Sequence, residues 1–136
     1  MMRILAAILT TSISLLAQSP LKWEYDLAAA QKRAKKEGKP VFVDIWAEWC
    51  PPCQHLRNVV FPSAEAQKAL ADYVPVSLMT ETRDRRALPD NAKVAQSFKV
   101  EGFPTMLILD ARGRELKRQV GAFRTGTDLK NWLKRK

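Results

Sequence analysis

The sequence predicts an α/β fold in which a central mixed sheet carries helices on both faces. Segments with the apolar, β-branched composition of buried strands alternate with segments of helical periodicity, which favours a parallel portion of sheet. Near the C-terminus, two strand-like segments flank a short turn and predict an antiparallel hairpin. With 136 residues, 46% of them apolar and 27% charged, the chain has the composition of one globular domain, which excludes collagen, coiled coils and disordered proteins.

The first helix is expected between Asp26 and Gly38. Leu27, Ala30 and Ala34 recur there with the spacing of one helix face. Asp26 is a suitable N-cap, and Gly38 is a residue that commonly ends a helix. The segment is therefore predicted to be a charged amphipathic helix.

A buried strand and a helix that begins with prolines are expected next. The compact apolar run over 41–46 contains β-branched residues and predicts a buried strand. Cys50, Pro51, Pro52 and Cys53 then open a helix, in whose first turn the missing N–H groups of the prolines cost little. The first cysteine is therefore expected at a helix N-terminus.

The rest of the chain continues the alternation and ends in a helix. The 80–90 segment is polar, carries three arginines, lacks periodicity and is predicted to be a loop. The C-terminal helix, around 129–133, has Thr125 and Thr127 as alternative caps. The other expected elements are a helix over 63–71, a strand over 73–79, a helix over 91–98, and strands over 105–109 and 115–120 with a turn over 111–114 between them.

Residues 1–19 have the pattern of a cleavable signal peptide. A short positive segment is followed by 14 largely apolar residues at 4–17, fewer than the about 20 that a spanning helix needs. The small residues Ala17 and Ser19 suit a cleavage site, and a retained membrane anchor is the alternative. Cleavage would leave a single domain over 20–136 in the periplasm or secreted from a bacterial cell, without stable membrane insertion, where thiols oxidise readily.

The formal net charge of +9 is compatible with nucleic acid, anionic lipid or an acidic protein as a partner. The basic residues are spread along the chain, with clusters at 83–86, 112–118 and 134–136. No motif that reads a nucleic-acid groove is recognised in the sequence. We therefore expect a solvated basic surface that steers acidic partners, and no nucleic-acid binding.

The two cysteines of the chain, Cys50 and Cys53, have a spacing that favours a redox function over a structural one. A disulfide between them closes a loop of four residues, and so short a loop stabilises a fold little. At a helix N-terminus, unpaired N–H groups and the helix dipole favour the thiolate of Cys50. Cys53, one turn later, can attack a mixed disulfide formed by Cys50 and release the product.

Metal binding by the same segment is the alternative. Covalent haem attachment requires histidine directly after the second cysteine, and Gln54 stands there. His55, two residues after Cys53, points to another side of the helix and is expected at the surface. We expect neither a bound metal nor an organic cofactor, and a copper carrier that uses the two cysteines remains an alternative function.

Asp44 interrupts the apolar strand over 41–46. It is either an acid at a solvated strand edge or a buried carboxylate whose pKa rises because burial disfavours its charge. The buried interpretation is favoured, because a reversal of the chain before Cys50 can bring the acid beneath the dithiol, where it can move protons. Trp49, directly before Cys50, is expected to shield the site and to offer an apolar docking surface.

The 44–53 segment, DIWAEWCPPC, closely resembles the active-site segment of thioredoxins, and GFPT at 102–105 resembles the cis-proline segment of that family. The order of the expected elements is also similar from about Trp23 onward. The 39–70 segment looks especially like the C-terminal thioredoxin-like domain of the bacterial disulfide reductase DsbD. The resemblance implies a thioredoxin-like fold.

The resemblance also implies a role for each matching residue. Cys50 would be the attacking thiol, Cys53 the resolving thiol and Asp44 the buried proton-transfer acid. Substrate would be bound by the residues that border the dithiol, namely Trp49, Phe103, a cis Pro104 and Thr105.

The sequence departs from the thioredoxin pattern at two places. Pro51 replaces the usual glycine between the cysteines and removes an N–H group near the thiolate. The 73–79 strand lacks the lysine that usually pairs with the buried acid, so Ser77 or Thr80 is expected near Asp44 instead.

The function that follows is that of a monomeric, exported thiol–disulfide oxidoreductase with a redox-active Cys50–Cys53 pair. By resemblance, it is expected to reduce disulfides of extracytoplasmic proteins and to exchange electrons with a redox partner protein. The alternatives are a dedicated reductant in cytochrome c maturation and the copper carrier.

Overall fold

The computed structural model describes residues 20–136, so the predicted signal peptide at 1–19 lies outside the described residues. The expected strands and helices are present in this part of the chain, with bounds close to the predicted ones. Among the helices of residues 20–136, none has the length and apolar character that crossing a membrane requires. In chain order the elements are α1 (Leu27–Glu37), β1 (Val41–Ala47), α2 (Pro51–His55), the π-helical turn η1 (Leu56–Val60), α3 (Ala64–Leu70), β2 (Val74–Glu81), α4 (Pro89–Ser97), β3 (Thr105–Leu109), β4 (Glu115–Val120) and α5 (Gly126–Lys134).

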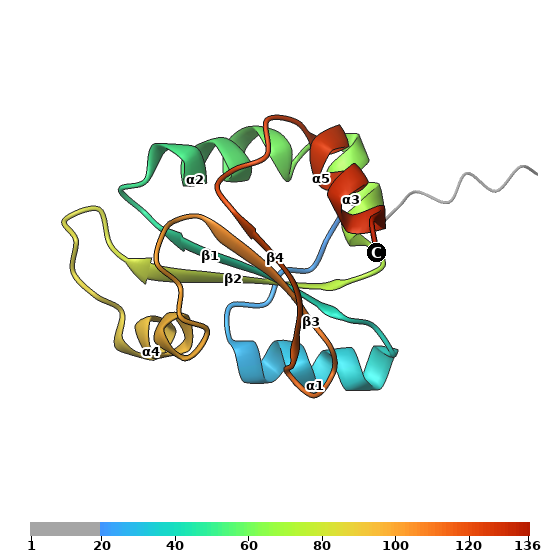
Figure 1. Cartoon of the computed structure of the whole chain (residues 1–136), viewed down its shortest axis with the longest axis horizontal. Helices are drawn as coiled ribbons and strands as arrows, with labels where there is room; N and C mark the ends of the chain where they lie inside the picture. The colour runs from blue at the N-terminus through green and yellow to red at the C-terminus, as the bar shows by residue number, and fades with distance from the viewer. Residues whose placement is uncertain (1–19) are drawn as a thin grey trace, which may run out of the picture.

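The four strands form one mixed sheet in the order β2-β1-β3-β4. β1 pairs in parallel with β2, whereas β3 is antiparallel to both β1 and β4. The predicted mixed sheet and C-terminal hairpin are therefore confirmed. Parallel pairing is confined to β1 and β2, because the chain returns through α4 to the edge where these strands end, and β3 starts there with Thr105 opposite Ile45 (Figure 1).

Helices cover both faces of the sheet, as predicted (Figure 1). α1 and α4 lie on one face, where Ala30 packs in a buried cluster with Val43. α2, η1, α3 and α5 lie on the other face, where Leu56 and Leu129 join Phe42 in a second cluster. Because β1 is covered on both sides, all seven of its residues are buried, which explains its almost continuous apolar sequence.

The helix ends confirm the predicted caps. The Asp26 carboxylate accepts a backbone N–H of the first turn of α1 at 2.8 Å, and Gly38 ends the helix with a φ of 64° in the left-handed region. Thr125, rather than Thr127, caps α5 and forms a capping box with Asp128. Local sequence signals therefore determine where these helices begin and end.

Two local features differ from the prediction. The loop after β2 is shorter than the expected 80–90, since β2 continues to Glu81 and α4 begins at Pro89. Thr80 belongs to the strand, and its buried hydroxyl donates to the Trp46 carbonyl at 3.0 Å. The helix after the cysteines also widens into η1, an irregularity that helical periodicity does not reveal.

Gly126→Ala is expected to destabilise the protein by about 1–2 kcal/mol. Gly126 begins α5 against the start of α3, and a Cβ there would lie 1.8 Å from Ser63 Oγ and 2.9 Å from Ser63 Cβ. The Ser63 hydroxyl cannot move freely, because it accepts the Ala66 N–H at 3.3 Å and donates to the last carbonyl of η1 at 2.6 Å. Urea unfolding measures the loss. Gly102→Ala is the matched control, since its Cβ would meet Val120 at an ordinary 3.8 Å, and an equal loss in both variants would contradict the prediction.

Candidate active site

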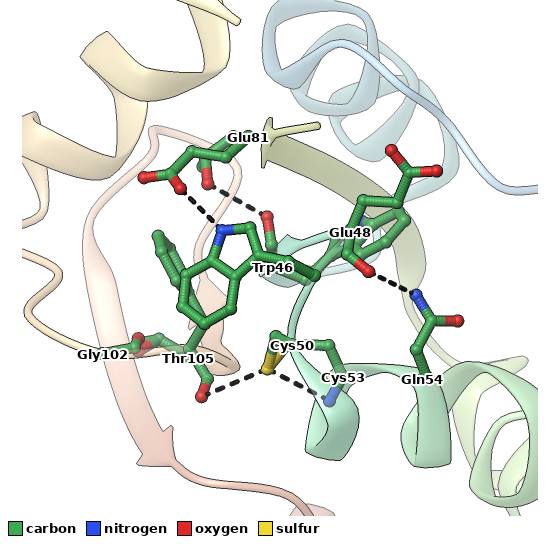
Figure 2. Close-up of a disulfide and its surroundings, with 11 residues drawn as sticks. Trp46, Glu48, Cys50, Cys53, Gln54, Glu81, Gly102 and Thr105 are labelled. Atoms are coloured by element: carbon green, nitrogen blue, oxygen red, sulfur yellow. Dashed lines mark hydrogen bonds between the residues drawn. A yellow bond between two sulfur atoms is a disulfide. The ribbon is translucent and has the colours of Figure 1, made fainter. Parts of the chain in front are cut away.

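Cys50 and Cys53 lie where β1 ends and α2 begins, and they form a disulfide with a Cα–Cα distance of 5.3 Å (Figure 2). Cys50 is the N-cap of α2, and its Sγ accepts the Cys53 N–H at 3.3 Å. Pro51 and Pro52 occupy the first turn, as predicted, and contribute no N–H group. The Cys53 amide is therefore a backbone donor that faces Cys50, and it would stabilise a Cys50 thiolate in the reduced protein.

The turn at 102–105 lies against the dithiol (Figure 2). The Phe103 carbonyl oxygen is 3.6 Å from Cys50 Sγ, and the Phe103–Pro104 peptide bond is cis. The Thr105 hydroxyl donates to the Gly102 carbonyl at 2.7 Å and closes the turn. Two segments that are 53 residues apart in the sequence therefore meet at Cys50.

Trp49 borders the dithiol and is held from two sides. Its ring makes an edge-on contact with Phe103, with centroids 6.2 Å apart. Its Nε1 donates to Glu81 Oε2 at 2.6 Å, and the Arg85 guanidinium lies 4.2 Å from the centroid of the ring. The loop after β2 thus contacts the site through Arg85, and nothing in the local pattern of that loop signals the contact.

Asp44 is buried in the middle of β1, with 1% of its surface exposed. Neither of its carboxyl oxygens has a hydrogen-bond partner within residues 20–136. Burial raises the pKa of Asp44 to about 7, and the positive charge of Arg57 opposes that rise. The interpretation of Asp44 as a buried carboxylate is therefore correct, and this acid can exchange a proton near neutral pH.

Asp44 faces the side of the sheet that carries the dithiol helix. Phe42, two residues before it, packs with Leu56 of η1. Trp46, two residues after it, packs in a cluster with both cysteines. Because alternate residues of a strand point to the same face, the Asp44 carboxyl lies on the side covered by α2 and η1.

The cation near Asp44 comes from the helix and not from the neighbouring strand. Ser77 is opposite Asp44 in the β1–β2 register, as expected. Its hydroxyl is nevertheless committed elsewhere, because it accepts from Trp46 Nε1 at 2.9 Å and from Arg57 at 3.0 Å. The positive charge that acts on Asp44 belongs to Arg57, which the sequence analysis missed. The sequence feature that could have indicated Arg57 is its spacing of four residues from Cys53, which places both side chains on one helix face.

His55 is exposed, as predicted, and its Nε2 lies 2.9 Å from the Arg124 carbonyl oxygen. In the part of the chain that the structure describes, no group of three His, Cys, Asp or Glu side chains is placed to hold a metal ion.

Together, the dithiol and Asp44 can perform thiol–disulfide exchange. The reaction needs a thiolate that attacks, a second thiol that resolves the mixed disulfide, and a group that accepts the proton of the resolving thiol. Cys50 and Cys53 at the helix N-terminus are two thiols of the kind that the first two functions require, and the buried Asp44 is an acid of the kind that the third requires.

Comparisons with known proteins agree with this chemistry. Residues 27–136 match the family model of the thioredoxin-like domain. The thiol:disulfide interchange protein DsbD of Colwellia psychrerythraea is 37% identical over 89 residues, which is 65% of this chain. The match covers 14% of that relative, so the chain corresponds to a small part of its length.

Solved structures share the fold at low sequence identity. A DsbH oxidoreductase has a TM-score of 0.70 at 21% identity, with 96% of both chains covered. The oxidised C-terminal domain of Neisseria meningitidis DsbD has a TM-score of 0.63 at 18% identity, with 77% of this chain and 87% of that chain covered. The chain belongs to the thioredoxin-like domain family.

Proposed function

We propose that the chain is an exported thiol–disulfide oxidoreductase that reduces disulfides of extracytoplasmic proteins. The observation that carries the proposal is the disulfide at the start of α2, with the Phe103 carbonyl 3.6 Å from Cys50 Sγ and Asp44 buried on the same side of the sheet. Export is supported by the signal-peptide pattern of residues 1–19. Its removal would leave a domain over 20–136 that acts in the periplasm or outside a bacterial cell.

The proposed reaction starts from the reduced protein. The Cys50 thiolate attacks a substrate disulfide, so that a Cys50–substrate disulfide forms and one substrate sulfur leaves and takes up a proton. The Asp44 carboxylate then accepts the proton of the Cys53 thiol, and the Cys53 thiolate attacks Cys50 Sγ. This step releases the second substrate thiolate and leaves the Cys50–Cys53 disulfide that the structure contains. A partner dithiol restores both thiols by the reverse exchange.

Substrate binding is assigned to the residues that surround the dithiol. Phe103 presents its backbone next to Cys50, where an extended segment of a substrate protein can form main-chain hydrogen bonds. Pro104 and Thr105 are buried and support this turn, and Trp49 adds an apolar surface beside it. The proposed partners are therefore protein disulfides and a reducing redox protein, and the acting species is a monomer.

The reduction potential of the Cys50–Cys53 pair tests the direction of electron flow. A reductase is expected to equilibrate near the thioredoxin value of about −270 mV, whereas a strong oxidant lies near about −120 mV. The purified protein is equilibrated in buffers of defined thiol/disulfide ratio, its free thiols are alkylated, and the two redox forms are counted by mass spectrometry. A value close to that of the strong oxidant would contradict the proposed reductive function.

A further inference from the structure

We propose that Arg57 is a positioning residue that favours the ionised form of Asp44, so that this carboxylate can accept the proton of Cys53. This inference rests on the proposed function, in which Asp44 takes part in the resolving step. It assigns the cation to the helix that carries the dithiol, whereas the sequence alone directs attention to the neighbouring strand.

Arg57 lies on the same side of the active-site helix as the cysteines. It follows Cys50 by seven residues and Cys53 by four, and α2 and η1 are continuous across this stretch. Cys53 packs in the cluster that contains Trp46, and the Arg57 guanidinium carbon lies 3.9 Å from the centroid of the Trp46 ring. The dithiol helix therefore places a cation over the strand that carries Asp44.

Two contacts fix the guanidinium on residues that neighbour the acid. It stacks on Trp46, which is two residues after Asp44 on the same face of β1. Arg57 Nη1 also donates to Ser77 Oγ at 3.0 Å, and Ser77 is opposite Asp44 in the β1–β2 register. Since Ser77 also accepts from Trp46 Nε1 at 2.9 Å, the three side chains hold one another in a single arrangement next to Asp44.

The other groups around Asp44 are neutral or have contacts of their own. At the positions that pair with Asp44, β2 contributes Ser77 and β3 contributes Met106. Burial raises the pKa of Asp44, and the charge of Arg57 is what opposes that rise. Within residues 20–136, three other titratable side chains have partners of their own: His55 contacts the Arg124 carbonyl, Glu81 accepts from Trp49, and Glu24 pairs with Arg33.

Arg57 can stay charged and partly hydrated in this position. Its side chain lines an open cavity of about 190 Å³ together with Trp23, Tyr25 and Gln67. A guanidinium remains protonated across the neutral range, and contact with water lowers the cost of placing its charge among buried groups. The field of Arg57 at Asp44 is therefore constant with pH, and the carboxylate titrates against it.

The pH dependence of the resolving step tests this role. Reduced full-length chain in excess is mixed with a disulfide-linked fluorescent peptide, and the release rate is followed in single turnover between about pH 5 and pH 9. Arg57→Gln is expected to move the inflection of the rate upward by about one to three pH units, the shift that an opposite charge at close range produces. At pH 7 the resolving rate should then fall about fivefold or more.

Two further variants keep the test informative. Arg57→Lys retains the positive charge and is expected to keep the inflection near its wild-type pH. Arg57→Met keeps an unbranched stem over Trp46 and takes the place of Arg57→Gln if the latter does not fold. Arg114→Gln is the matched control, because Arg114 pairs with Asp110 at 2.7 Å in the turn between β3 and β4, and it should leave the inflection unchanged.

A second readout does not depend on turnover. The carboxyl ¹³C resonance of Asp44 is titrated by NMR in the wild-type protein and in each variant, with Asp44→Asn used to assign the signal. Its midpoint should rise in Arg57→Gln by the same amount as the inflection of the rate.

The outcomes separate the two hypotheses. If Asp44→Asn abolishes the inflection while Arg57→Gln keeps both wild-type midpoints, the role of Arg57 is overturned and the proposed function stands. If Asp44→Asn retains the wild-type inflection, the proton-transfer role of Asp44 fails, and the role of Arg57 fails with it.

Discussion

Cys50→Ser is expected to lower the rate of insulin disulfide reduction to the uncatalysed background. The attacking sulfur is lost, and a serine hydroxyl at this position is a far poorer nucleophile at neutral pH than a thiolate at a helix N-terminus. The rate is measured from the turbidity of insulin in the presence of dithiothreitol, with the wild-type protein as reference. Wild-type activity in the variant would refute the assignment of Cys50 as the nucleophile.

Cys53→Ser is the matched variant, because it separates attack from resolution. Cys50 can still attack a substrate disulfide, but no second thiol remains to break the mixed disulfide. The variant is expected to accumulate a covalent complex with the substrate, seen as a higher mass that dithiothreitol removes. Both cysteines are buried, with 3% of Cys50 and 1% of Cys53 exposed, and Cys50 is the one that has the Phe103 carbonyl at 3.6 Å on the proposed substrate side. If Cys50→Ser formed the complex instead, Cys53 would be the attacking thiol and Cys50 the resolving one, which would contradict the assignment.

Asp44→Asn is expected to stabilise the protein above pH 7 by about 1–3 kcal/mol. The pKa of Asp44 rises from 3.8 to about 7 on folding. Between these values the folded state holds a proton that the unfolded state has released, so the stability of the wild-type protein falls as the pH rises through this window. Above pH 7 the wild-type protein has lost about 4 kcal/mol of its free energy of unfolding, and the variant avoids this loss. The variant instead buries an amide without a partner, which costs about 1–3 kcal/mol, so its net gain is the difference.

The same substitution is expected to slow the resolving step near pH 7, since the amide cannot accept the Cys53 proton. Urea unfolding of the oxidised proteins from pH 4 to pH 8 measures the stability, and single-turnover reduction measures the rate. The wild-type protein should lose stability across this range, and the variant should not show that loss. An Asp44→Asn protein that is less stable than wild type at pH 8 and resolves substrate at an unchanged rate would contradict both expectations.

Most of the secondary structure is predictable because its signals are local. Asp26 and Gly38 mark the ends of α1 through a side-chain cap and a left-handed φ, and both are properties of a few neighbouring residues. β3 and β4 also have the predicted bounds, since short apolar or alternating segments flank a turn. The dithiol at the start of α2 follows in the same way, because prolines in a first helical turn place the preceding cysteine at the N-cap.

The surroundings of the dithiol are less predictable because they combine distant segments. Trp49 directly precedes Cys50, but its hydrogen bond to Glu81 and its contact with Arg85 depend on how the end of β2 and the following loop lie against it. The direction of β3 is likewise not a local property. A helix that connects two strands favours parallel strands. Here the path of the chain through α4 brings β3 back antiparallel to β1.

The amino-acid sequence alone therefore predicts most of the elements and the reactive cysteine pair, and it favours the burial of Asp44, since periodicity, caps and spacing act over one or two turns of chain. Packing specifies the electrostatic partner of that acid. Whether Ser77 or Arg57 influences the charge of Asp44 depends on the rotation of η1 over β1 and on the β1–β2 register. Both are set by contacts between segments far apart in the sequence. Because the guanidinium both stacks on Trp46 and donates to Ser77, the positive charge that acts on Asp44 comes from the helix and not from β2.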